Sequence, residues 1–213
     1  MPEVSEQPDR IIVFSVDDHP LVREGIAAVV NAEPDMSLVA MASSGREAIQ
    51  GFREHRPDVT LMDLRLPDLS GIDALIAIRT EFPEARVLML TTFNGDVDVQ
   101  RALKAGAYGY LLKSAPRRNL VEAIRRVHSG KKSVPPEIAA QIAENWSGES
   151  LSQRELEVLR HIAGGNRNKD IAGRLFISEE TVKVHIKHIM EKLGASDRTQ
   201  AMAIAVRRGI IQI

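Results

Sequence analysis

The residues best suited to chemistry stand at the ends of apolar segments in the first half of the chain. Asp17 and Asp18 follow the apolar run in "FSVDDHP", and Asp63 ends the run in "VTLMDLRLPDLSG". A pair of threonines follows "VLML", and Lys113 follows "GYLL". A buried charge is costly unless another group compensates it. Three carboxylates gathered in one place therefore need a cation.

Clustered carboxylates of this kind indicate a Mg²⁺ site and phosphoryl chemistry. Mg²⁺ binds oxygen ligands and retains water, so a few carboxylates and a phosphoryl oxygen suit it. A carboxylate can also act as a nucleophile and form an aspartyl-phosphate. Asp63 is the best candidate because it stands alone before a loop with Pro and Gly. Lys113 and one threonine hydroxyl would neutralise charge, and spacing does not choose between Thr91 and Thr92.

Alternating strands and helices are expected to position these residues. Short apolar or β-branched runs predict strands over 11–16, 36–41, 59–62, 87–90 and 108–112. Helical periodicity lies between them, over 21–30, 46–53, 72–79, 97–105 and 119–127. This alternation predicts an α/β fold, a doubly wound parallel sheet of five strands with helices on both faces. Ligands of such sheets bind at the carboxyl ends of the strands, where the candidate residues stand.

Composition limits the class of protein. The chain has 213 residues, of which 44% are hydrophobic and 27% charged, which indicates a soluble globular protein of one or two domains. It has no long apolar run for a membrane span, and its polar first residues predict no signal peptide. Zero cysteines exclude disulfides and thiolate metal sites and agree with a cytoplasmic location.

Charge divides the chain into two parts. Residues 1–150 carry 17 basic and 22 acidic side chains, whereas residues 151–213 carry 11 and 7. Between them "KKSVPPEIAAQIAENWSGES" predicts a linker with a short helix over 138–143, which Trp146 could anchor. An acidic part joined to a smaller basic part suggests a polyanionic partner for the second, although ordinary scatter of charge explains composition alone equally well.

The second part is expected to contain only helices. Start and stop residues predict four of them: from the Ser152 cap to Gly164, over 169–175, from the Ser178 cap to Leu193, and over 198–207. Ser152 and Glu155 form a capping-box pattern. The last helix could pair across a dimer or close the core of its own domain.

The third of these helices has the features of a DNA-recognition helix. Its apolar residues Val182, Ile186, Ile189 and Leu193 form one stripe. A charged opposite face is usually only solvated, but here it follows a short helix and a tight turn in a basic domain. That order is the helix-turn-helix arrangement, whose second helix enters the major groove. Lysines there can reach phosphates or guanine edges, and an exposed valine can contact a thymine methyl.

The first part resembles the receiver domain of two-component response regulators, which has a flavodoxin-like fold. The resemblance rests on "VDDHPLVREG", "LMDLRLPDLSG", "VLMLTT" and "GAYGYLLKS", in this order. It implies that a histidine kinase phosphorylates Asp63, and that Lys113 and Thr91 contact the phosphoryl group. The implied Mg²⁺ ligands are Asp17, Asp18, Asp63 and the backbone carbonyl of Arg65. Thr91 and Tyr110 would be the switch residues.

Three positions in this part have simpler explanations. Tyr110 could be plain strand packing, and His19 is better explained as a helix-start residue than as a metal ligand. Many receivers have a proline after the lysine, often after a cis bond, whereas this chain has Ser114. Residue type therefore gives no support for a cis peptide there.

The second part resembles the helix-turn-helix domain of the LuxR/NarL (FixJ) group, through nearly all of "LSQRELEVLRHIAGGNRNKDIAGRLFISEETVKVHIKHIMEKLGASDRTQA". The implied base-edge contacts are Lys183, Val184 and Lys187. The implied phosphate or scaffold residues are Asn168, Lys169, Thr181 and His185. Asn168 also stands where a helix cap belongs. His185 and His188 are spaced for a metal, but no carboxylate or cysteine completes such a site.

We therefore interpret the chain as a DNA-binding response regulator and not an enzyme. The expected divisions are a disordered segment over 1–9, a receiver over 10–130, a linker over 131–150 and a helix-turn-helix domain over 151–213. Expected partners are double-stranded DNA, a cognate sensor histidine kinase and a second copy of the chain, with no membrane.

Two other interpretations stay open. One is a phosphotransferase or phosphatase with an aspartyl-phosphate, although "MDLRL" lacks the second acid of a D-x-D motif. The other is a regulator whose receiver senses a protein or small molecule without phosphorylation.

Overall fold

The computed structural model describes residues 10–92, 96–136, 139–140 and 151–211. These residues form two compact units, one around a β-sheet and one made of helices, and each is described here by itself. No helix in the described ranges is both long enough and apolar enough to cross a membrane. The predictions for residues 1–9, for Trp146 and for most of the helix over 138–143 fall outside the described residues.

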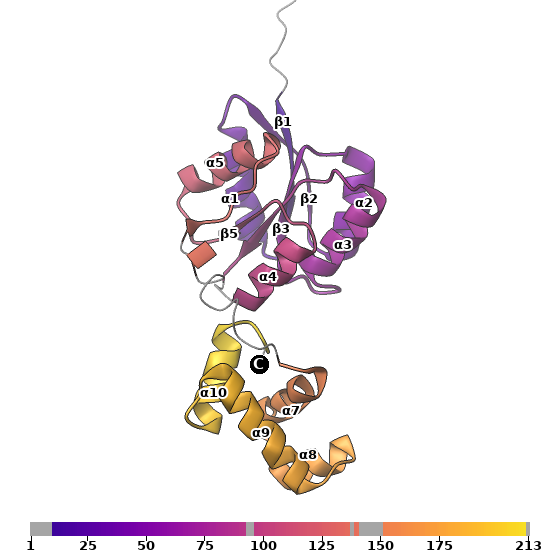
Figure 1. Ribbon diagram of the computed structural model, residues 1–213. Helices are drawn as coiled ribbons and strands as arrows, with labels where there is room; N and C mark the ends of the chain where they lie inside the picture. Colours follow the sequence, from indigo (N-terminus) through magenta and orange to yellow (C-terminus); the bar gives the residue numbers. More distant parts are fainter. Residues whose placement is uncertain (1–9, 93–95, 137–138, 141–150, 212–213) are drawn as a thin grey trace, which may run out of the picture. The chain divides into compact units, whose positions relative to one another are not determined.

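The first unit is built on a five-stranded parallel sheet, which confirms the predicted fold class (Figure 1). The strand order is β2-β1-β3-β4-β5. The strands are β1 (Ile11–Val16), β2 (Met36–Ala42), β3 (Val59–Asp63), β4 (Val87–Thr91) and β5 (Gly109–Leu112). All residues of β3 and β4 are buried, as expected for the central strands of a sheet that is covered on both faces.

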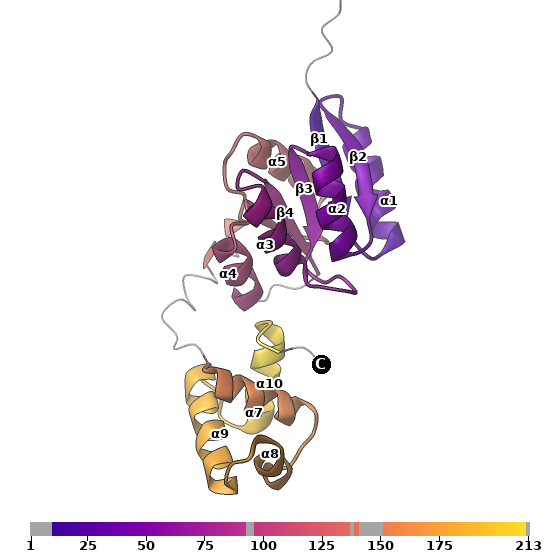
Figure 2. The same ribbon diagram turned by 90° about the vertical axis from the view of Figure 1, so that its right-hand side faces the viewer.

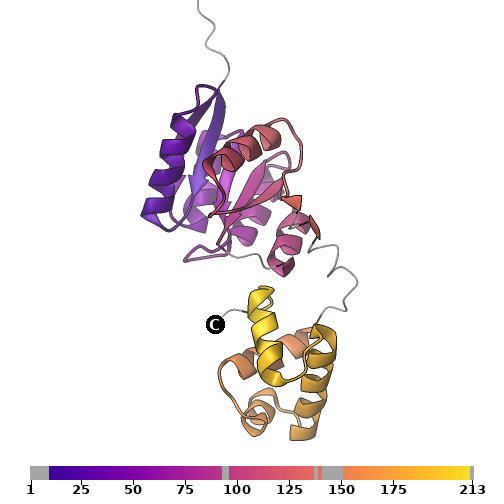
Figure 3. The same ribbon diagram turned by 90° about the vertical axis from the view of Figure 1, so that its left-hand side faces the viewer.

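Helices cover both faces of this sheet. They are α1 (Pro20–Asn31), α2 (Gly45–His55), α3 (Gly71–Glu81), α4 (Asp96–Lys104) and α5 (Arg117–His128). Helices α1 and α5 pack side by side on one face, which is turned toward the viewer in Figure 3. Helices α2 and α3 pack together on the other face (Figures 1 and 2). The carboxyl ends of the strands therefore lie at one edge of the sheet, between two helical layers.

The chain stays with the sheet beyond the predicted boundary near residue 130. Ser133 forms a parallel bridge with Gly109 at the outer edge of β5. The N–H of Tyr110 donates to the Ser133 carbonyl at 2.9 Å, and the N–H of Ser133 donates to the Tyr108 carbonyl at 2.8 Å. These bonds satisfy part of the exposed edge of β5.

The second unit consists of the predicted helices around a small apolar core. They are α7 (Gln153–Ala163), α8 (Asn168–Leu175), α9 (Glu179–Leu193) and α10 (Arg198–Arg207). Ser152 caps α7 in the expected capping box with Glu155, and Ser178 caps α9. Ala201 and Ala205 of α10 are buried in the same core as α7 and α9, so α10 closes the core of its own unit.

Candidate functional site

The side chains predicted to meet at the carboxyl edge of the sheet do lie together. Lys113 Nζ lies 2.6 Å from Asp17 Oδ2 and 2.8 Å from Asp63 Oδ2. Asp17 is fully buried, and the side chains of Asp63 and Lys113 are only 6% and 9% exposed. The three residues follow or end β1, β3 and β5, whose parallel register brings their carboxyl ends to the same level. A buried ammonium group thus bridges two buried carboxylates.

Burial and neighbouring charges shift the acid–base balance of this cluster. Burial raises the pKa of the Asp63 carboxyl above its ordinary value, and the charge of Asp17 adds to that effect. Bonds from Lys113 and from the Arg65 backbone N–H act in the opposite direction but do not offset it. For Lys113, burial alone would lower the pKa, but the two carboxylates outweigh burial and raise it. Lys113 is therefore held as a cation beside a carboxylate that ionises with difficulty.

The residues present fit a divalent cation. Asp17 Oδ2 is buried and, although close to Lys113, has no well-aligned hydrogen bond. Asp17, Asp18, His19 and Asp63 each offer one donor atom, and these atoms lie within 4.8 Å of one another. The three carboxylate oxygens of this group suit a hard cation such as Mg²⁺. Arg65, whose backbone carbonyl is the remaining predicted ligand, lies in the loop directly after Asp63.

The structure distinguishes the two threonines that spacing left equal. Thr91 is the last residue of β4 and is 3% exposed, whereas Thr92 is exposed. The Thr91 carbonyl accepts the backbone N–H of Lys113 at 2.7 Å, which joins the ends of β4 and β5. Tyr110 is 1% exposed within β5. All peptide bonds among the described residues are trans, including the one that precedes Ser114.

Sequence reasoning missed two residues that hold the loop after Asp63. The Asp68 carboxylate accepts the N–H groups of Gly45 at 2.7 Å and Arg46 at 3.0 Å, which ties this loop to the start of α2. Gly71 begins α3 so close to β3 that a Cβ there would clash with the Asp63 backbone oxygen. The "PDLSG" segment contained both residues, but only the three-dimensional structure shows what they contact.

The predicted base-contacting residues are exposed along α9. Val184 is 49% exposed, although it is apolar, and the side chains of Lys183 and Lys187 are 53% and 72% exposed. Lys183 pairs with Glu180 at 2.9 Å and Lys187 with Glu191 at 3.7 Å. Exposed pairs of this kind contribute little to stability. These lysines can therefore exchange their partners for phosphates or base edges at low cost.

The other predicted contact residues are partly structural. Asn168 is the first residue of α8 and not its cap, and its Oδ1 accepts Arg198 Nη1 at 3.2 Å. The Thr181 hydroxyl lies 2.8 Å from the Ser178 hydroxyl at the start of α9. Lys169 is exposed and His185 half-buried. Of these residues, Lys169 is the one whose charged group is most available to a phosphate.

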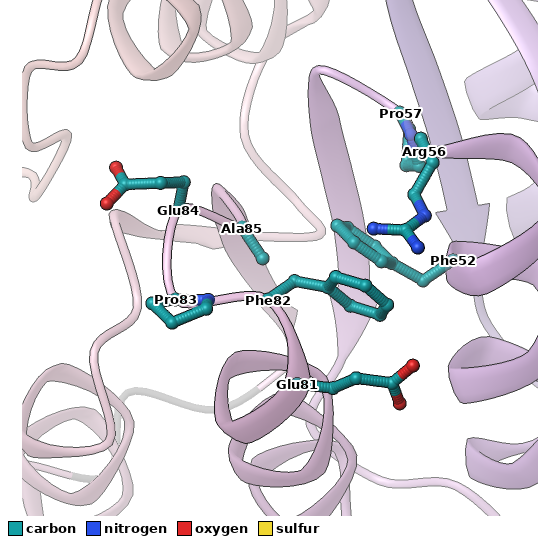
Figure 4. Close-up of a pocket in the computed structure, with 8 residues that line it drawn as sticks. All are labelled: Phe52, Arg56, Pro57, Glu81, Phe82, Pro83, Glu84 and Ala85. Atoms are coloured by element: carbon teal, nitrogen blue, oxygen red, sulfur yellow. The ribbon is translucent and has the colours of Figure 1, made fainter.

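A separate pocket of about 360 Å³ lies between α2 and α3. Figure 4 shows its lining, in which the rings of Phe52 and Phe82 lie near each other and Arg56 covers Phe82. None of the predicted site residues lines this pocket.

Comparison with known proteins shows the family of both units. Residues 13–125 match the response regulator receiver domain, and residues 149–205 match the bacterial regulatory proteins of the luxR family. A relative described as the uncharacterized transcriptional regulatory protein YxjL of Bacillus subtilis is 42% identical over 96% of this chain and 99% of its own. The chain belongs to the response regulators that join a receiver domain to a luxR-family domain.

Two solved structures of such regulators are similar over both units. RcsB from Salmonella enterica serovar Typhimurium, bound to promoter P1flhDC with phosphomimetic BeF₃⁻, is 26% identical with a TM-score of 0.73. That match covers 92% of this chain and 97% of RcsB. A structure of two RcsB dimers bound to two parallel DNAs is 25% identical with a TM-score of 0.71. That match covers 93% of this chain and 98% of the RcsB chain.

Proposed function

We propose that this response regulator accepts a phosphoryl group on Asp63 from a histidine kinase, and that this modification controls its binding to specific DNA sequences in the cytoplasm. The observation that carries the proposal is the position of the Asp63 carboxylate. It lies at a strand end, 2.8 Å from a buried ammonium group and among further carboxylates. This arrangement supplies a nucleophile and the charges that phosphoryl transfer requires.

The residues of the pocket have separate tasks in the transfer. An Asp63 oxygen attacks the phosphorus, and the bond from phosphorus to the kinase histidine breaks. Lys113 is placed to donate to a phosphoryl oxygen once Asp63 is phosphorylated, and the Thr91 hydroxyl is the second donor. Asp17, Asp18, Asp63 and the Arg65 carbonyl would hold Mg²⁺, which neutralises charge on the phosphoryl oxygens when bound.

Phosphorylation changes the partners that Lys113 has in the unmodified pocket. Its Nζ contacts Asp63 Oδ2 directly. After phosphorylation of Asp63, that oxygen is either bonded to phosphorus or lies beside the phosphoryl group. We propose that Thr91 and Tyr110 follow this change and bias the receiver between two states. The shift in DNA affinity is limited to the difference in stabilisation of those two states.

The helical unit supplies the DNA contacts in this proposal. Lys183, Val184 and Lys187 lie exposed on α9 and are placed to reach base edges in the major groove. Four further residues contact the DNA phosphates or support the side chains that contact them: Thr181, His185, Asn168 and Lys169. Helix-turn-helix proteins commonly bind paired half-sites as dimers, and the structure of RcsB dimers bound to DNA supports a homodimer as the active form.

Intact-mass measurement after incubation with Mg²⁺ and acetyl phosphate tests the phosphorylation step. Wild type should gain the mass of one phosphoryl group, and Asp63→Asn should gain none. Asp73→Asn, a change of another aspartate in the next helix, is the matched control and should behave as wild type. Phosphorylation of Asp63→Asn to the same extent as wild type would refute Asp63 as the acceptor.

A further inference from the structure

The loop over residues 64–70, which follows the proposed phosphoacceptor, supplies one donor to it. The backbone N–H of Arg65 bonds to the Asp63 carboxylate. At the base of the loop, the N–H of Gly71 donates to the Leu64 carbonyl at 2.9 Å. This bond holds the two ends of the loop together but does not fix the part between them. The orientation of the Arg65 donor therefore depends on what holds the rest of the loop.

The far side of this loop is fixed to α2 through Asp68. Its Oδ1 accepts the N–H of Gly45 at 2.7 Å and that of Leu69 at 2.9 Å, and its Oδ2 accepts the N–H of Arg46 at 3.0 Å. Burial alone would raise the pKa of the Asp68 carboxyl, but the backbone bonds outweigh burial and lower it. Asp68 is therefore held as a carboxylate, and hydrogen bonds to a charged acceptor are among the stronger ones in proteins.

The start of α2 is built to receive this contact. The Ser44 hydroxyl caps the helix by accepting the N–H of Glu47 at 3.2 Å. The N–H groups of the first two helical residues have no acceptor within the helix, so they remain for Asp68. Gly45 also allows the loop to approach closely, because a Cβ there would clash with the Leu69 side chain. The loop is thus held by bonds and by close packing at the same point.

We propose that Asp68 is a positioning residue for the phosphorylation of Asp63. It acts through Arg65, because the anchored loop holds the Arg65 N–H against the carboxylate whose oxygen attacks phosphorus. Without the anchor, the loop would shift and Asp63 would lose this orientation, and a displacement of about 1 Å at a reacting group can cost roughly 100-fold in rate. The inference rests on the proposed function, because it concerns the rate of the same phosphoryl transfer.

The rate at which acetyl phosphate, with acetate as the leaving group, phosphorylates the full-length chain tests this assignment. With Mg²⁺ present and intact mass followed over time, Asp68→Ala should react roughly 10- to 100-fold more slowly than wild type. Asp68→Asn should lie between them, because the amide oxygen can keep the Oδ1 bonds, whereas the amide nitrogen cannot accept the Arg46 N–H. Ser44→Ala removes the other cap of α2 and leaves Asp68 in place, so this matched control should react at the wild-type rate.

Far-ultraviolet circular dichroism would establish that each variant is folded. Two-dimensional nuclear magnetic resonance of the nitrogen-labelled chain then gives a readout that a role of Asp68 only as a helix cap would not change. Asp68→Ala should shift the amide resonance of Arg65, and Ser44→Ala should leave it in place.

Three results would overturn the inference and leave the proposed function standing. They are a wild-type rate in Asp68→Ala, an equal slowing by Ser44→Ala, and an unshifted Arg65 resonance in a slow Asp68→Ala. Failure of wild type to gain a phosphoryl group on Asp63 would overturn both.

Discussion

Replacing Lys113 with methionine tests how the acidic pocket is stabilised when no metal is bound. Methionine keeps an apolar side chain of similar length and removes the ammonium group that lies 2.6 and 2.8 Å from the two carboxylates. Removing one member of a buried ion pair costs about 3–5 kcal/mol, because the remaining charge stays buried without a partner. The side chains concerned are less than a tenth exposed, so solvent screens little of this cost.

The loss of stability should depend on pH in a definite direction. Burial and Asp17 raise the pKa of Asp63, and Lys113 opposes them, so the variant raises that pKa further. An acid with a raised pKa holds its proton more firmly in the folded state, and the free energy of unfolding then falls as pH rises above the unfolded value. We expect Lys113→Met to lower that free energy by about 3–5 kcal/mol near pH 8 and by less near pH 5.

Urea unfolding followed by far-ultraviolet circular dichroism, in EDTA and at several pH values, measures this effect. Lys131→Met, a change of an exposed lysine, should alter stability little. Adding Mg²⁺ should restore part of the loss in Lys113→Met, because a bound cation stabilises the folded state by mass action. A loss below about 1 kcal/mol at every pH, or one that grows as pH falls, would refute the reasoning.

Three further predictions concern other parts of the chain. Gly71→Ala should destabilise the sheet unit by about 3 kcal/mol in thermal unfolding, because its Cβ would meet the Asp63 backbone oxygen, whereas Gly25→Ala in open space should stabilise α1 slightly. Glu155→Gln should cost about 3 kcal/mol in urea at neutral pH by breaking the 2.9 Å ion pair between α7 and α9. Burial raises the pKa of Glu155, but its bonds with Lys192 and Ser152 outweigh burial and lower that pKa overall. The stability that this ion pair contributes in the wild type should therefore be lost as pH falls through the lowered pKa. If Lys187 contacts a base edge, Lys187→Ala should weaken binding to the specific DNA sequence by about 1–3 kcal/mol. If Lys187 contacts a phosphate, the variant should bind all DNA sequences more weakly by a similar factor, and its affinity should depend less steeply on salt concentration. Filter binding at several salt concentrations distinguishes the two results.

The gathering of charged residues at one sheet edge could be predicted because it follows from strand order and direction. Alternating apolar runs located the strands to within one or two residues, and parallel strands place their carboxyl ends together. The structure adds Asp63 and Thr91 to the strands themselves as their last residues. The distances to Lys113 could not be predicted, because they depend on the register between β1, β3 and β5, which spacing along the chain does not specify.

Local signals were sufficient where the interaction spans only a few residues. The caps at Ser152 and Ser178 were predicted correctly, since each accepts an N–H three residues further along. Asn168 was not interpretable in the same way, because its partner Arg198 is 30 residues away in sequence. The role of Asp68 was missed for the same reason, since it binds the start of α2 across 23 residues.

The orientation of His19 marks another limit of sequence reasoning. Its position before Pro20 correctly indicates the start of a helix. Whether its imidazole caps that helix or turns to the carboxylates depends on the side-chain torsion angles of His19. Residue type and spacing do not determine those angles, so the contact with Asp18 appears only in the structure.

Selection of genomic DNA fragments by the full-length chain, with Mg²⁺ present, tests the central claim most directly. Wild type and Asp63→Asn would each be used with and without a small phosphodonor, and the bound fragments sequenced. Enrichment of discrete sites only by wild type with the donor is the result that this account predicts. Equal enrichment of the same sites in all four samples would contradict it, because DNA binding would then be independent of Asp63 phosphorylation.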